Sequence, residues 1–108
     1  MSYNKHHNVY VIELDKAVLR EPKFAEANAG CDPEKACFYV GLTGLIPGER
    51  FEKHRTGYKS NKYVRKYGRR LCPRLYEEYN PMFYEDAQEM EVELARMLRE
   101  KGHAVWQK

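Results

Sequence analysis

Glu91 is the residue that most directly suggests chemistry, because it is a carboxylate placed within an apolar stripe. At 100° per residue of a helix, it falls among the apolar stripe residues and their flanks, Ala87, Met90, Leu94, Ala95, Met97 and Leu98. Burying a carboxylate is costly unless it is paired, hydrogen-bonded or bound to a cation. One interpretation is a structural salt bridge, or an edge position that reaches water. The other is a ligand for a hard divalent cation, which prefers carboxylate oxygen.

A second chemical signal is the concentration of positive charge between Pro47 and Arg70. This segment holds nine basic and two acidic residues, a net charge of +7, whereas the remaining chain carries −4. Contacts of such a segment with phosphates would release counterions and supply most non-specific affinity for nucleic acid. An ordinary solvated basic surface is the alternative. Interleaved tyrosines, Tyr58, Tyr63 and Tyr67, offer rings for stacking or packing. The residues predicted to bind nucleic acid are Lys59, Lys62, Arg65, Lys66 and Arg69.

Two predicted strands precede the basic segment, and both are rich in β-branched and aromatic residues. The first covers residues 8–14 and the second covers residues 36–42. Gly41, inside the second strand, indicates close approach of another backbone or of a ligand. Residues 16–36 contain Pro22 and a cluster of turn residues, so they predict a long, partly helical connection between the two strands.

Two predicted helices carry the basic segment itself. The first runs over residues 47–55 and stops at Gly57. The second is a short helix over residues 61–67, with Ser60 as its N-cap and Gly68 as its left-handed stop. Together they would concentrate much of the positive field on one stretch of surface.

The C-terminal third of the chain predicts a further long helix with short flanking segments. Residues 74–79 fit a short edge strand, although Pro73 weakens that assignment. The amphipathic helix that carries Glu91 covers residues 83–101 and ends at Gly102. Residues 103–107 could form a short closing strand.

Length and composition favour a single domain over residues 1–108. The chain is 43% hydrophobic and 32% charged, which suits one small folded core. No run of about 18 apolar residues and no apolar signal-peptide core occurs, so we expect neither a membrane span nor secretion. The three cysteines, Cys31, Cys37 and Cys72, are odd in number and lack metal-ligand spacing, which favours reduced thiols in the cytoplasm.

The strand motifs and the residues that follow them resemble the GIY-YIG nuclease family. Asn8-Val9-Tyr10 and Tyr39-Val40-Gly41 are similar to the paired tripeptides of that family, and Arg50, His54 and Glu91 follow at family-like spacing. The resemblance covers essentially the whole chain apart from residues 16–36. It implies an α+β fold with a small, mainly antiparallel three-stranded sheet flanked by helices, and an insertion at about residues 16–35 between the first two strands.

The same resemblance implies a metal-dependent endonuclease that hydrolyses phosphodiester bonds in DNA. Glu91 would hold Mg²⁺ or Mn²⁺, Tyr39 is favoured as the general base, and Arg50 would contact the scissile phosphate. Tyr10 and His54 would orient the attacking water or support proton transfer. Because the unperturbed pKa of tyrosine is about 10, the metal or Arg50 must lie nearby for tyrosine to act as a base at neutral pH.

The sequence departs from the family pattern in ways that bear on the substrate. Asn8 replaces the first glycine, and Val9 and Val40 replace the two isoleucines. The interval between Tyr10 and Tyr39 is much longer than the usual hairpin spacing, which affects the expected substrate geometry more than the chemistry.

Other interpretations remain open at this point. Tyr10 and Tyr39 could be core rings with satisfied hydroxyls, and Arg50 with His54 could form an exposed helix face. The enzyme could act on single-stranded or branched DNA, or rely on a protein partner for specificity. The alternatives to a DNA endonuclease are a nucleic-acid-binding module that does not cut and a nuclease directed at RNA.

Overall fold

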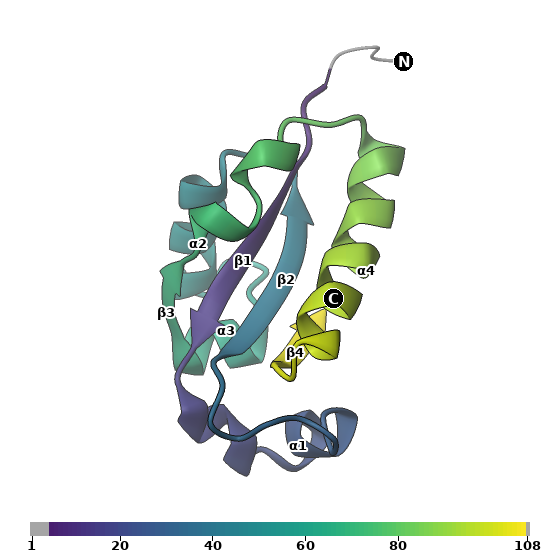
Figure 1. Ribbon diagram of the computed structural model, residues 1–108. Coiled ribbons are helices and arrows are strands. Elements are labelled where there is room, and N and C mark those ends of the chain that lie inside the picture. Colours follow the sequence, from purple (N-terminus) through teal and green to yellow (C-terminus); the bar gives the residue numbers. More distant parts are fainter. Residues whose placement is uncertain (1–4, 108) are drawn as a thin grey trace.

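The strands form one sheet in the order β3-β1-β2-β4 in the computed structural model, which describes residues 5–107 (Figure 1). β1 (Asn8–Leu14) pairs antiparallel with β2 (Cys37–Thr43) and with β3 (Gly68–Leu71), whereas β4 (Ala104–Gln107) runs parallel to β2. The predicted α+β class is confirmed. The predicted number of three strands is wrong, because the closing segment adds β4 as a fourth strand, and its parallel pairing with β2 makes the mainly antiparallel sheet a mixed one.

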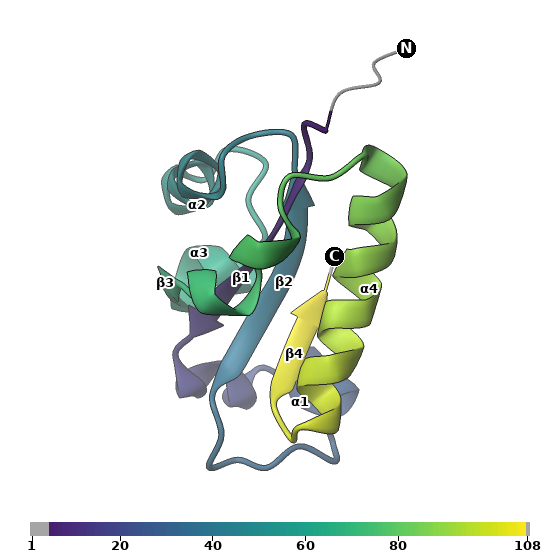
Figure 2. The ribbon, with the colours of Figure 1, turned by 45° about the horizontal axis from the view of Figure 1, so that its top comes forward.

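Four α-helices of the described part of the chain surround this sheet. In both views α2 and α3 lie on the side of β1 and β3, and α4 runs alongside β2 and β4 (Figure 2). No helix within residues 5–107 is long and apolar enough to cross a membrane. The α-helices are α1 (Pro22–Ala27), α2 (Pro47–Thr56), α3 (Lys62–Tyr67) and α4 (Tyr84–Glu100), and the 3₁₀ turns are η1 (Lys16–Arg20), η2 (Pro73–Leu75) and η3 (Glu77–Tyr79).

The helix boundaries follow the predicted ones closely, but two capping assignments are wrong. Gly57 ends α2 with φ of 89°, in the left-handed region, as predicted. The N-cap of α3 is Asn61 and not Ser60, because the Asn61 side chain accepts from the backbone N–H groups of Tyr63 and Val64. Gly68 has an extended backbone and begins β3. Glycine is needed there for space, since an added Cβ would lie 2.5 Å from the Val64 carbonyl oxygen.

The predicted edge strand over residues 74–79 is also wrong, because this segment forms the 3₁₀ turns η2 and η3. Pro73, at the start of η2, has no N–H to give to a strand ladder. The edge of β1 is satisfied by a side chain instead. The Asn80 amide accepts from the Val9 N–H and donates to the Val9 carbonyl, each at 2.8 Å.

The connection between β1 and β2 packs onto the sheet as part of the core. Phe24 of α1 is fully buried, and its ring lies 5.3 Å from that of Tyr63 and 6.1 Å from that of Trp106. Asn28, directly after α1, accepts from the Val105 N–H at 2.9 Å and donates to the Val105 carbonyl at 3.1 Å. Asn28 thus satisfies the outer edge of β4 as Asn80 satisfies the edge of β1.

Asn28→Ala is expected to destabilise the fold by about 1–3 kcal/mol, because the buried Val105 N–H would lose its acceptor. Urea denaturation at neutral pH would measure this loss as a lower midpoint with an unchanged slope. Glu26→Ala on the exposed side of α1 is the control, and it should stay within about 0.5 kcal/mol of the unmodified chain. Equal stability of both variants would contradict the edge-pairing role of Asn28.

Candidate active site

The two tyrosines with predicted catalytic roles, Tyr10 and Tyr39, lie on the same face of the sheet at the centre of the candidate site. Tyr10 pairs with Gly41 across the β1–β2 ladder, and Tyr39 pairs with Ile12. Because side chains alternate along a strand, this register places both rings on one face, with centroids 6.1 Å apart. Both are buried, at 1% and 2% exposure. An added Cβ at Gly41 would lie 2.6 Å from the Tyr10 hydroxyl oxygen, so Gly41 makes room for Tyr10 rather than for a ligand.

His54 of α2 is fully buried against these two tyrosines, so the interpretation of Arg50 and His54 as an exposed helix face is wrong for His54. Its Nδ1 accepts from the Asn61 N–H at 3.1 Å. That contact leaves the ring proton on Nε2, which lies 2.9 Å from the Tyr10 hydroxyl and donates to it. A backbone amide at the start of α3 therefore fixes both the orientation and the tautomer of His54.

The surroundings of Tyr10 and Tyr39 shift the pKa values of the two hydroxyls differently. Burial raises the pKa of Tyr10 far above its ordinary value, and the neighbouring Tyr39 adds to this shift. Burial and the charge of Glu91 raise the pKa of Tyr39 to about 12, while the hydrogen bond with Tyr10 and the charge of Arg50 act to lower it. Tyr39 is thus the tyrosine whose phenolate the surroundings support better.

Arg50 lies one helical turn before His54 and faces the same cluster. Its guanidinium donates to the carbonyls of Tyr58 and Lys59, at 3.3 and 2.8 Å. Its positive charge acts to lower the pKa of both Tyr10 and Tyr39. A guanidinium has five N–H donors, and these contacts leave some of them for an anion.

Glu91 reaches the cluster from α4, as the spacing of its apolar neighbours predicts. It is 7% exposed, and its Oε1 accepts from Gln107 Nε2 at 3.2 Å. It borders a depression of about 480 Å³ that is also lined by Leu42, Tyr84, Gln88 and Val92. Glu91 is therefore buried but adjacent to a surface that a substrate can reach.

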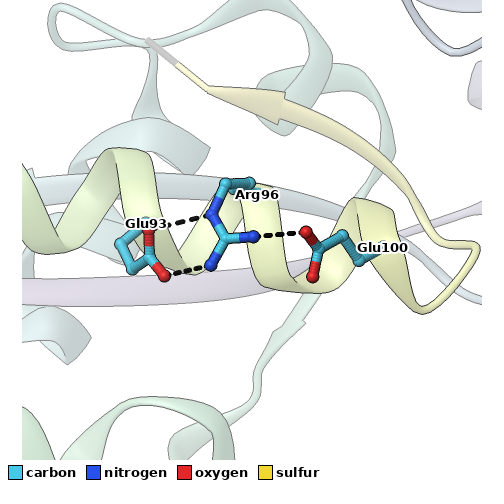
Figure 3. A network of polar contacts seen from close by, with 3 residues as sticks. All are labelled: Glu93, Arg96 and Glu100. Carbon is cyan, nitrogen blue, oxygen red and sulfur yellow. Dashed lines mark hydrogen bonds and ion pairs between the residues drawn. The ribbon is translucent and has the colours of Figure 1, made fainter.

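The charged side chains on the outer face of α4 form ion pairs with one another at the surface. Arg96 bridges Glu93 and Glu100 in an exposed network of ion pairs (Figure 3). These carboxylates are satisfied along the helix surface by partners three and four residues away. Glu91 is the acidic side chain that α4 buries.

The acidic residues do not assemble a preformed metal cage. Among residues 5–107, no group of three or more histidine, cysteine, aspartate or glutamate side chains is arranged to hold a cation. Mg²⁺ in phosphate-processing sites is often held by one or two carboxylates, with water and substrate phosphate completing its shell. Glu91 fits a site of that open kind.

The predicted nucleic-acid-binding residues divide into two groups. Lys66 forms an ion pair with Glu21 at 3.3 Å, and Arg69 forms one with Asp15 at 3.6 Å. Both acidic partners belong to the connection between β1 and β2. The other three, Lys59, Lys62 and Arg65, are exposed and have no ion pair within the described residues. The positive surface is thus centred on the α2–α3 turn and the start of α3.

Two residues that support the site were not predicted from the sequence. Asn61 orients His54 through its backbone N–H, and Gln107 donates to Glu91. Asn61 could have been found, because asparagine is as good an N-cap as serine. Gln107 carries no local signal, since only the parallel pairing of β4 with β2 brings it to α4.

Comparisons with protein-family models, with curated proteins and with solved structures found no match to this chain. The functional assignment therefore depends on the residues of the site and on their geometry.

Proposed function

We propose that this chain is a metal-dependent endonuclease that hydrolyses phosphodiester bonds, with DNA as the favoured substrate and a site of the GIY-YIG type. The observation that carries the proposal is the convergence of five side chains from four elements, Tyr10, Tyr39, Arg50, His54 and Glu91. They are separated by up to 81 positions in the sequence. The antiparallel β3-β1-β2 part of the sheet also supports the resemblance on which this assignment draws.

The residues divide the work of phosphodiester hydrolysis. Arg50 would bind the scissile phosphate and stabilise the negative charge that grows on its oxygens. Tyr39, as the phenolate, would take the proton of the attacking water as its oxygen bonds to phosphorus, and the leaving oxygen would depart with the electron pair of the broken bond and take a proton from solvent. Tyr10 would stabilise that phenolate by donating a hydrogen bond to it, while the Tyr10 hydroxyl oxygen accepts from His54 Nε2.

Glu91 would hold Mg²⁺ or Mn²⁺ at this site. A divalent cation there supplies charge stabilisation to the phosphate and offsets the carboxylate charge that raises the pKa of Tyr39. Because Glu91 fits only an open, single-carboxylate site, we expect the chain to hold the cation weakly until a substrate phosphate completes the shell.

Cleavage of end-labelled DNA and RNA tests the proposal. Single-stranded, duplex and branched DNA, and single-stranded RNA, are incubated with the chain in Mg²⁺, Mn²⁺ or EDTA. Metal-dependent cutting that Arg50→Ala reduces, with the fold retained by circular dichroism, supports the assignment and identifies the substrate. Cutting of RNA alone would show the RNA-directed alternative. Metal-independent binding with no cutting of any substrate would show the binding module.

Removing the charges of Lys62 and Arg65 is expected to flatten the salt dependence of binding. The double change Lys62→Gln with Arg65→Gln should reduce the slope of log Kd against log salt by about 2, roughly one for each lost phosphate contact. The matched change Lys66→Gln with Arg69→Gln removes the same charge, but these cations already face Glu21 and Asp15. It should therefore change the slope less. Equal effects of the two double changes would contradict the division of these cations into ion-paired and unpaired groups.

A further inference from the structure

Tyr58 presents an aromatic ring to solvent directly beside the candidate active site. It follows the end of α2 and is 56% exposed. The ammonium group of Lys53 lies 4.6 Å from the centroid of its ring, and that of Lys59 lies 5.7 Å away. An exposed ring with two cations against it is a combination that packing within this chain does not require.

The loop that carries Tyr58, residues 57–61, is fixed by the candidate catalytic residues. Arg50 donates to the carbonyls of Tyr58 and Lys59, and His54 accepts from the N–H of Asn61. The Tyr58 N–H donates to the Lys53 carbonyl at 2.9 Å. Because Arg50 bonds the backbone of Tyr58 itself, a group stacked on this ring would lie next to whatever Arg50 binds.

The charge around the ring favours a polyanion over an acidic or neutral protein surface. In addition to the two lysines, the Arg65 guanidinium lies against the loop, since an added Cβ at Gly57 would be 3.7 Å from its Cζ. A strand of nucleic acid combines closely spaced negative charges with flat aromatic bases, which match both features of this surface. A base within a duplex is already stacked between its neighbours, so it is an unpaired base that a protein ring can stack on.

The lysine contacts do not prevent such stacking. A cation–π contact at an exposed site is weaker than a stacked base, and lysine side chains are flexible. Lys53 and Lys59 can therefore move from the ring to neighbouring phosphates when a base takes their place.

We propose that Tyr58 stacks on an unpaired nucleobase of a single-stranded segment whose adjacent phosphate is held by Arg50. This inference deepens the proposed function and rests on it for the identity of the substrate as nucleic acid. It attributes a preference for single-stranded or locally unpaired substrates to Tyr58, which is not one of the five proposed active-site residues. DNA and RNA both supply the unpaired base, so the test includes each.

The experiment measures binding and not cleavage, so that the two proposals can fail separately. Fluorescence anisotropy in EDTA follows short labelled single strands of DNA and RNA, a DNA strand of the same length with abasic positions, and a duplex. The variants are Tyr58→Ala, Tyr58→Phe and Tyr58→Leu, the last keeping apolar bulk without a ring. Lys53→Gln with Lys59→Gln serves as the matched charge control, and thermal melting verifies the fold of each variant.

Tyr58→Ala and Tyr58→Leu should weaken binding to base-bearing strands by about 5- to 150-fold, the range for one stacked base. Neither should affect the abasic strand, and Tyr58→Phe should bind like the unmodified chain. The charge control should weaken base-bearing and abasic strands alike, with a flatter salt dependence.

Equal binding of the abasic and base-bearing strands by the unmodified chain would overturn the inference. So would equal losses on both strands in Tyr58→Ala, which would show a charge or folding effect. A base-dependent loss in a chain that cuts nothing would support the stacking role while overturning the nuclease assignment. Binding to no nucleic acid at all would overturn both and leave a protein partner for this surface.

Discussion

Glu91→Gln is expected to lower cleavage by about 10³-fold or more while the fold and nucleic-acid binding are retained. Glutamine has nearly the same shape and can still accept from Gln107 Nε2, but it lacks the charge that would hold a divalent cation. The stabilisation that such a cation gives a phosphoryl transition state is several kcal/mol, and each ~1.4 kcal/mol corresponds to a tenfold change in rate. Single-turnover cleavage of the preferred substrate in Mg²⁺ would measure the loss.

Two further variants separate a catalytic role of Glu91 from a structural one. Gln107→Ala removes the side chain that donates to Glu91, so it would reproduce the loss if Glu91 acted mainly by holding β4 against α4. Glu93→Gln removes a carboxylate two residues away that belongs to the exposed network of α4. We expect both variants to keep cleavage within about tenfold of the unmodified chain, because neither change removes a group proposed to bind the cation or the phosphate. Normal cleavage by Glu91→Gln would refute the metal-ligand assignment.

Features of the site that depend on local spacing were predictable from the sequence. The burial of Glu91 follows from the apolar residues three and four positions away on the same helix. The pairing of Tyr10 and Tyr39 on one face follows from two β-rich segments, once their antiparallel register is given. Both features follow from the number of residues per turn of a helix and from the alternation of side chains along a strand, and such spacing can be recognised in a single sequence.

Features that depend on contacts between distant segments were not predictable in the same way. The Lys66 and Arg69 charges are partly offset by Glu21 and Asp15, which the connection between β1 and β2 places beside α3 and β3. Likewise, no strand of the described residues pairs with β1 at Val9 on the side away from β2, because the side chain of Asn80 accepts from the Val9 N–H and donates to the Val9 carbonyl. A side chain that takes the hydrogen bonds of a neighbouring strand produces no periodic pattern in the sequence.

The burial of His54 bears on the choice between a core and a catalytic interpretation of the tyrosines. A purely structural pair of rings needs one partner for each hydroxyl, which a backbone carbonyl or water can supply. Here a fully buried imidazole is oriented by the Asn61 N–H and donates to the Tyr10 hydroxyl, and the ring of Tyr10 lies beside that of Tyr39. A buried imidazole held in one orientation against a buried tyrosine is costly to assemble, and the proton transfer proposed above would use this arrangement.

Gly41→Ala is expected to lower cleavage by about 10²-fold by displacing Tyr10. The added Cβ would lie 2.6 Å from the Tyr10 hydroxyl oxygen, 2.7 Å from its Cζ and 3.0 Å from Cε2 of Tyr39. Tyr10 cannot easily yield, because its ring is buried and its hydroxyl is held by His54. A shift of about 1 Å in a catalytic group can cost about 10²-fold in rate, and overpacking of a core costs about 1–3 kcal/mol of stability.

Gly48→Ala is the matched control for this change, because nothing lies within 4 Å of its added Cβ. Gly48 is in α2, the helix that carries Arg50 and His54, and alanine there should stabilise the fold by about 0.4–1 kcal/mol. Cleavage rates and thermal melting of both variants distinguish the outcomes. If Gly41→Ala lost stability but cleaved normally, cleavage would not need the observed position of the Tyr10 hydroxyl, and the hydrogen bond from His54 to Tyr10 would be structural. If it lost cleavage far beyond its loss of folded protein, the position of the Tyr10 hydroxyl, for which Gly41 leaves room, would be required for cleavage.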